Sequence, residues 1–258
     1  MKILLYLAST LFILYGNDLN ISVQEDYEPY ELYQKFSSKD GPIKESEIDP
    51  ERFFQLGWSK DSKFAFMVIR SIEAEDCERA ELFIQNLKND EIIFNKKFTV
   101  CTDEFSSRKK SINFALKIIQ NKHSKEISDI LSSHGIINKK TKLQEFPIKI
   151  SNDTYIDYIR SQCSESNLFY SNEMFISQLK LFLVSHNNNR EKGIIKKKKI
   201  FDKKFNLDLV YDAELLGYLP SPFNNEIALV MVYIERGWEK TPYPTRYIIV
   251  GASLSKNL

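Results

Sequence analysis

The sequence predicts an α+β fold, mostly β, in which antiparallel β-meanders form one domain with a single amphipathic helical insertion. Three observations predict it. From Phe53 onward, runs rich in β-branched and aromatic residues alternate with turn residues. One stretch instead repeats its apolar residues every three or four positions. The chain has 258 residues, 43% of them hydrophobic, and this is enough to fill the core of one large domain.

Residues 1–16, MKILLYLASTLFILYG, predict a secretory signal peptide, because Lys2 precedes an apolar run from Ile3 to Tyr15. The run is shorter than the roughly 20 residues of a membrane-spanning helix. We therefore expect cleavage near Gly16, no transmembrane segment afterwards, and a secreted or periplasmic protein. An uncleaved anchor is the alternative.

Cleavage would leave a chain without net charge. Loss of Lys2 reduces the 36 basic residues to 35, equal to the 35 acidic residues. A balanced surface exerts no long-range attraction on nucleic acid or anionic membranes. The sequence therefore predicts no nucleic-acid partner.

Residues 17–50 are acidic and are interrupted by Gly41, Pro42 and Pro50. They predict an irregular lead-in with at most one short strand. A single β-rich domain is expected over 51–258, because no linker rich in Gly, Ser or Pro divides it.

Four β-prone runs open this domain and predict an antiparallel meander: RFFQLGW, KFAFMVIRSI, AELFIQNL and EIIFNKKFTV. The helical insertion follows at about 105–134, with Leu116, Ile119, Ile127 and Leu131 at helical spacing. Gly135 is well placed to end the helix in a left-handed conformation. We expect the helix to cover one face of a sheet. Seven more runs then predict strands: KLQEFPIKI, DTYIDYIRS, MFISQLKLFLVS, GIIKKKKIF, AELLGYL, EIALVMVYIE and TRYIIVGASL.

Two related hairpin sequences lie 160 residues apart, LGWSKDSKFAF from Leu56 and LGYLPSPFNNEIALVMV from Leu216. Trp58 precedes the first turn. In the second turn Pro222 pre-sets one backbone angle, and Asn224 or Asn225 is expected to be left-handed.

This arrangement resembles the W-S-P-D-G-K-x-I-A hairpin of TolB-type β-propeller blades, which also recurs in bacterial secreted proteins of unknown function. The resemblance implies propeller-blade-like meanders. An incomplete propeller is implied, because two copies are visible and a closed propeller needs four to eight blades. Blades of this kind serve as binding and scaffolding surfaces as well as enzymes.

Cys77 and Cys101 are candidates for a disulfide. If AELFIQNL and EIIFNKKFTV form a hairpin centred on Asn89, residues whose numbers sum to 178 face each other, and these two cysteines do. Cys163 then remains as the odd thiol. The alternative is three separately buried thiols.

The sequence lacks a glycine-flanked serine, a glycine-rich phosphate loop, a paired-cysteine metal motif and a zinc-protease helix motif. It therefore predicts no catalytic residue, no metal site and no cofactor. With the blade-like hairpins, this favours a non-catalytic binding or structural scaffold of the cell envelope. The alternative is a secreted hydrolase whose acidic residues, distant in sequence, converge in a cleft.

The loop between the last two strands supplies the candidate partner-binding residues Arg236, Trp238 and Tyr243. If the aromatic side chains are exposed and nearby prolines restrict the loop, they would offer a large contact area and lose little conformational entropy on binding. The alternative is that Trp238 folds back over the open end of the sheet.

A lysine run, Lys196 to Lys199, offers a second surface. It predicts an edge strand whose charges discourage pairing between chains. Its functional alternative is binding of an anionic polymer of the cell envelope. A protein or such a polymer is therefore the expected partner class.

Overall fold

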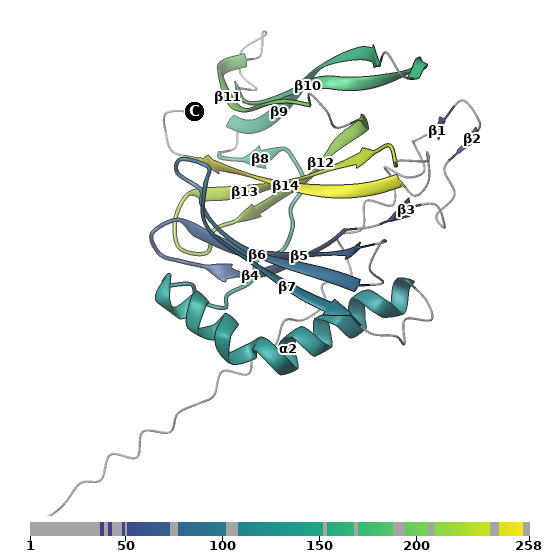
Figure 1. Cartoon of the computed structure of the whole chain (residues 1–258). Coiled ribbons are helices and arrows are strands. Elements are labelled where there is room, and N and C mark those ends of the chain that lie inside the picture. Colours follow the sequence, from purple (N-terminus) through teal and green to yellow (C-terminus); the bar gives the residue numbers. More distant parts are fainter. Residues whose placement is uncertain are drawn as a thin grey trace, which may run out of the picture.

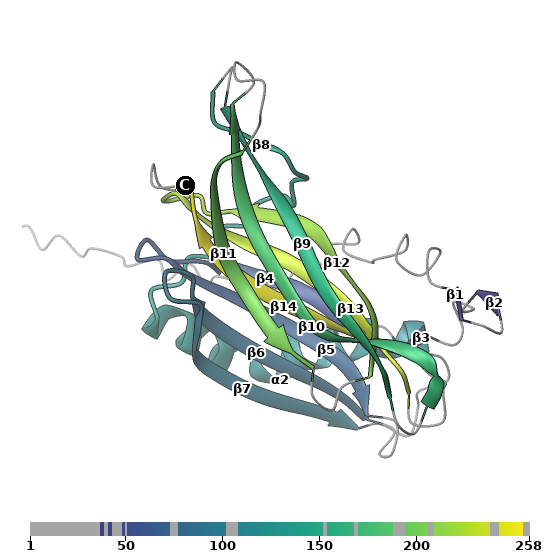
Figure 2. The same cartoon turned by 90° about the horizontal axis from the view of Figure 1, so that it is seen from above.

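A computed structural model describes residues 37–38, 41–42, 48–49, 51–72, 77–101, 108–151, 154–167, 170–187, 194–205, 209–237 and 243–254. One helix and three four-stranded sheets lie in successive layers (Figure 1). Seen from above, the strands of the three sheets run in broadly the same direction (Figure 2). The predicted fold, mostly β with antiparallel meanders and one helix, is confirmed.

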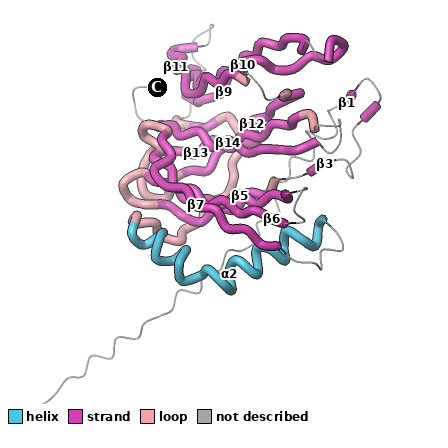
Figure 3. The backbone as a smooth tube through the Cα atoms, viewed as in Figure 1, coloured by secondary structure: helices cyan, strands magenta, loops and turns pink. Residues whose placement is uncertain are grey.

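The first sheet is the predicted meander, with strands in chain order. These are β4 (Arg52–Trp58), β5 (Lys63–Ile72), β6 (Cys77–Asn86) and β7 (Glu91–Cys101). The helix α2 (Arg108–Ser133) covers one face of this sheet (Figure 3). Met67, Ile69 and Leu82 of the sheet are fully buried in one cluster with Leu116 and Ile119 of the helix. The helical repeat in the sequence therefore marks the face that packs on the sheet.

The end of α2 follows the predicted pattern. Gly135 has a φ of 70°, and the amide of Ile136 donates to Leu131 O at 2.8 Å. Ile136 is buried against the same core as the helix. This is the left-handed helix cap with a following apolar contact.

The second sheet lies in the middle of the stack. It contains β12 (Val210–Pro220), β13 (Glu226–Glu235), β14 (Tyr243–Ser253) and the two-residue strand β3 (Ile48–Asp49). Nine of the ten residues of β13 are buried. Val230 packs toward the first sheet, and Leu229 and Met231 pack toward the third. The continuous apolar run of β13 follows from this position, since a strand covered on both faces has no polar side.

The third sheet contains β11 (Ile194–Lys204), β10 (Tyr170–Asn187), β9 (Thr154–Asn167) and β8 (Ile148–Lys149), in that order. The lysine run lies on β11, an edge strand as predicted, and Lys197, Lys198 and Lys199 are exposed. The predicted lead-in contains three two-residue strands where one short strand is expected: β3 and the antiparallel pair β1 (Ser37–Ser38) and β2 (Gly41–Pro42).

The predicted strand KLQEFPIKI is wrong over most of its length. Only β8 and one isolated bridge, between Gln144 and Tyr218, are strand-like in this segment. Residues 134–147, the connector, instead lead from α2 to β8 of the third sheet along the side of the stack.

That connector explains the two related hairpins. It exchanges two main-chain hydrogen bonds with Trp58 through Ile137, and two more with Tyr218 through Gln144, all between 2.8 and 3.0 Å. Each contact lies beside a bulge at a glycine. A Cβ on Gly57 would lie 2.2 Å from Ile137 O, and one on Gly217 would lie 2.3 Å from Gln144 O. The shared Leu-Gly-aromatic sequence is therefore a docking site for the connector.

The tips of the two hairpins are also joined, because Asn224 Nδ2 donates to Ser62 Oγ at 3.0 Å. The predicted left-handed residue at Asn224 or Asn225 is wrong. The left-handed conformation lies instead in the first turn, at Ser62, with a φ of 74°. Asn224 stabilises its turn through its side chain, whose Oδ1 accepts from Glu226 N.

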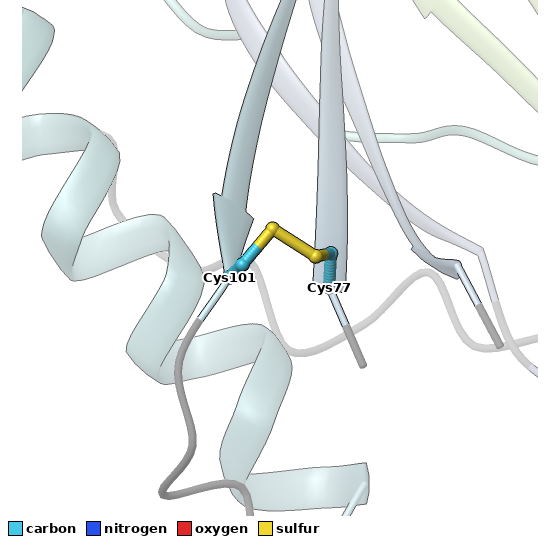
Figure 4. The surroundings of a disulfide bond; sticks show 2 residues. All are labelled: Cys77 and Cys101. Carbon is cyan, nitrogen blue, oxygen red and sulfur yellow. A yellow bond between two sulfur atoms is a disulfide. The ribbon is translucent and has the colours of Figure 1, made fainter. Parts of the chain in front are cut away.

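The predicted disulfide between Cys77 and Cys101 is confirmed (Figure 4), with the Cα atoms 4.2 Å apart. The two residues are direct cross-strand partners, and pairs whose numbers sum to 178 continue along β6 and β7 as far as Ile84 and Phe94. A bulge after Ile84 then shifts the register by one residue. Cys163 is a free, exposed thiol.

The predicted signal peptide, residues 1–16, lies outside the described residues. Within the described part of the chain, no helix combines the length and apolar character needed to cross a membrane.

Candidate functional site

Of the residues predicted to contact a partner, the two that the structure describes, Arg236 and Tyr243, are largely buried. Tyr243 is 3% exposed and packs with Ile48 and Ile234. Its ring therefore offers little contact area to a partner, because it fills the corner where β3 joins the second sheet. The Arg236 side chain is mostly buried and forms an ion pair with Glu173 at 3.3 Å. Trp238 lies outside the described residues, and the role of the loop in binding stays a prediction.

A cleft of about 380 Å³ lies between the first and second sheets, at the outer edge of β14. It draws residues from distant parts of the sequence, and β11 of the third sheet also reaches it. Its lining comprises Glu51, Phe66, Val68, Arg70, Glu81, Phe83, Gln85, Asp90, Ile92, Phe201, Tyr233, Arg246, Tyr247, Ile248 and Ile249.

The cleft exists because β14 is only briefly paired on its outer side. The strand β3 pairs in parallel with Tyr243 and Pro244, and beyond this point no described strand is hydrogen-bonded to the outer edge of β14, although β11 of the third sheet comes close to it. Side chains bond this edge instead, at every second residue. Glu51 Oε2 accepts from Tyr247 N at 2.7 Å, and Gln85 Nε2 donates to Ile249 O at 3.0 Å.

The hairpin between β6 and β7 closes one end of the cleft. Asp90 Oδ1 accepts from Gly251 N at 2.6 Å. A Cβ on Gly251 would lie 2.5 Å from Leu87 O, so glycine is required for this close approach. Glu51, whose own amide donates to Thr245 Oγ1 at 3.0 Å, lies toward the other end.

The floor of the cleft is aromatic. Phe66 and Phe83 stack with ring centroids 5.1 Å apart, and Tyr247 packs against Phe53 at 5.5 Å. Contacts of this kind favour a ligand with an apolar or aromatic group.

Charged groups surround that floor. Arg70 and Lys97 form ion pairs with Glu81 at 3.1 and 3.6 Å, and Arg246 pairs with Glu235 at 3.7 Å. The cleft therefore offers an apolar surface next to basic groups.

Two carboxyl groups in the cleft are perturbed. Burial raises the pKa of Glu51 to about 7, although the Tyr247 amide, Arg246 and Arg70 all favour the ionised form. Burial also raises the pKa of Asp90, against hydrogen bonds from Gly251 and Gln85. Burial thus outweighs the favourable partners at both positions.

Three carboxyl groups, those of Glu51, Glu81 and Asp90, therefore converge in one cleft. Each is already engaged. Glu51 and Asp90 bond main-chain amides of β14, and Glu81 bonds Arg70. The arrangement fits a structural role better than that of a catalytic carboxylate, which must reach substrate.

None of these residues belongs to a recognisable sequence motif. The pattern of side chains along β5 and β6 does indicate an unusual sheet face. Phe66, Val68 and Arg70 alternate on β5, and Glu81, Phe83 and Gln85 alternate on β6, so each apolar face carries polar residues. Polar residues on a buried face mark a place where the core opens or where hydrogen bonds are required.

Comparison of the chain with known protein families, with curated proteins and with solved structures finds no match.

Proposed function

We propose that this protein is a non-catalytic binding or scaffold protein of the bacterial cell envelope, exported through its N-terminal signal peptide, and that the cleft beside β14 is its binding site. The observation behind the proposal is an apolar floor with basic groups at its rim, in which all three carboxyl groups already serve the fold. The blade-like hairpin sequences agree with it, since the meanders they resemble often act as scaffolds.

Binding at the cleft is tested with the aromatic anion 8-anilinonaphthalene-1-sulfonate. We expect saturable binding that is weakened by Ile92→Glu, because Ile92 lines the cleft and is 45% exposed. Ile137→Glu is the matched control, since this isoleucine is 43% exposed and is not among the lining residues. Equal effects of the two substitutions would exclude the cleft as the binding site.

A secreted hydrolase is the second candidate. It is favoured by the pKa of Glu51, which is close to that of a general acid working at neutral pH, in a cleft that also contains Glu81. A panel of fluorogenic esters, peptides and glycosides separates the two proposals. Turnover that is abolished by both Glu51→Gln and Glu81→Gln would establish the hydrolase and overturn the scaffold.

Export is tested by expressing the full chain in a bacterium and measuring the mass of the exported protein. We expect an N-terminus near Asn17. Retention of residues 1–16 on a cytoplasmic product would contradict the envelope location.

A further inference from the structure

We infer that the cleft takes an extended peptide of a partner protein, which adds to the outer edge of β14 as a further strand and places an acidic and an apolar side chain, two residues apart, onto the first sheet. This inference rests on the proposed binding function and names the ligand class.

Beyond β3, the outer edge of β14 has no hydrogen-bonded strand among the described residues. Gln85 of β6 bonds Ile249 O, and Leu87 at the end of β6 contacts Gly251, so β6 lies beneath the β14 edge. The strand β7, next to β6, therefore lies beneath the position beyond that edge. Among the described residues, the second sheet fills this position only with the two residues of β3.

The two faces of β7 differ in burial. Its helix-facing side chains Phe98 and Val100 are buried, whereas Asn95, Lys97 and Thr99 on the other face are exposed. A sheet face next to a stacked sheet is normally covered. This face of β7 is exposed because no described strand of the second sheet lies above it.

Main-chain groups of β14 point toward this unfilled position. Ile249 O accepts from Gln85 and Tyr247 N donates to Glu51, both on the side away from β13. In an antiparallel strand the N–H and C=O of one residue point to the same side, so Ile249 N–H also points outward. An added strand would bond these groups in the way that strand addition uses. The buried Oε1 of Gln85 has no hydrogen-bond partner among the described residues, so a nearby peptide N–H would also satisfy this acceptor.

The pattern of the first sheet sets the peptide sequence. Glu81 pairs across the strands with Lys97, and Phe83 pairs with Asn95 and with Phe66. The Glu81–Lys97 pair and the Phe83–Asn95 pair are two residues apart along the strands, and side chains on one face of a strand repeat with the same spacing. Lys97 and Arg70 share the single carboxylate of Glu81, so one positive charge remains for a ligand carboxylate, and the two phenylalanines suit an apolar group.

The upper wall of the position belongs to the third sheet. Phe201 of β11 and Tyr233 of β13 line the cleft, and Lys203 Nζ lies 5.0 Å from the Tyr233 ring. A peptide beside β14 would thus meet basic groups above and below, which favours an acidic segment.

The test uses fluorescein-labelled heptapeptides and the full disulfide-bonded chain, read by fluorescence anisotropy. The probes are Thr-Glu-Thr-Phe-Thr-Val-Thr and its reversed sequence, which cover both strand directions. The control is Thr-Thr-Glu-Phe-Val-Thr-Thr, which has the same composition without the alternation. We expect at least one probe to bind about tenfold more tightly than the control.

Two exposed positions on β7 test the geometry without disturbing the core. Asn95→Trp fills the strand position and Lys97→Glu reverses the charge that faces the acidic residue, so each should weaken binding by about tenfold or more. The matched controls are Lys117→Trp and Lys122→Glu, at exposed positions on α2. These should leave binding unchanged.

Hydrogen exchange of the Ile249 amide gives a direct readout of strand addition, and we expect it to slow when the probe binds. The inference is overturned if neither probe binds, if the control peptide binds equally well, if Asn95→Trp has no effect, or if exchange at Ile249 is unchanged. In each case the anilinonaphthalene result decides separately whether the cleft binds ligands at all.

Discussion

Glu51 allows a quantitative test of how burial controls the edge of β14. It is 5% exposed and bonds β14 through both its amide and its carboxylate. Its pKa rises from 4.5 to about 7 on folding. The folded protein therefore holds this proton more tightly than the unfolded chain does.

The sign of the pH dependence follows from this difference. Below about pH 4.5 the Glu51 carboxyl is protonated in both the folded and the unfolded state, so its raised pKa does not reduce the free energy of unfolding. Between about pH 4.5 and 7 the unfolded chain ionises first, so stability falls as pH rises. A shift from 4.5 to about 7 at roughly 1.4 kcal/mol per pKa unit amounts to about 3 kcal/mol, reached above pH 7.

Glu51→Gln removes the titratable carboxyl group and retains a side-chain oxygen that can accept a hydrogen bond from the Tyr247 amide. We expect the free energy of unfolding of the variant, relative to the unsubstituted protein, to increase by about 3 kcal/mol between about pH 4 and pH 8. Urea unfolding followed by circular dichroism at several pH values measures this difference. Other titrating groups, including Asp90, are common to both proteins and cancel.

Glu145→Gln, at an exposed position, is the control and should show no such pH dependence. A difference between Glu51→Gln and the unsubstituted protein that stays constant over the same pH range would refute the reasoning. It would mean that burial does not hold the proton on Glu51.

Two further substitutions test the construction of the first sheet. Gly57→Ala places a Cβ 2.2 Å from Ile137 O and should lower the free energy of unfolding by about 3 kcal/mol. Gly135→Ala, whose Cβ would meet no atom within 4 Å, should lower it by about 1 kcal/mol. Equal losses in urea unfolding would show that the connector does not require a glycine at position 57. Replacing both Cys77 and Cys101 by alanine opens a loop with a sequence separation of 24 and should cost about 3 kcal/mol. The unsubstituted protein should lose a similar amount on reduction, and a melting temperature unaffected by reduction would contradict the disulfide.

Much of the fold could be predicted because its signals are local. Alternating side chains identified the meander from β4 to β7, and helical spacing identified α2 within a few residues. The position of the turn predicts that Cys77 faces Cys101, because a tight turn fixes the register of the two strands that it joins.

The errors concern segments whose conformation depends on distant contacts. The segment KLQEFPIKI alternates apolar and polar residues near its end, which is typical of a strand, yet only β8 and a single bridge at Gln144 are strand-like in it. Tyr243 follows a turn-rich loop, yet β3 and β13 enclose its ring. Neither outcome is encoded in the neighbouring residues.

The sequence by itself determined which segments become strands or helix, which cysteines pair, and where the helix ends. Only the tertiary structure decided how the three sheets stack, that Glu51 is buried beside Tyr247, and that the outer edge of β14 borders a cleft. The physical reason is that strand periodicity and turn geometry act over a few residues, whereas stacking and burial depend on apolar faces that meet from opposite ends of the chain.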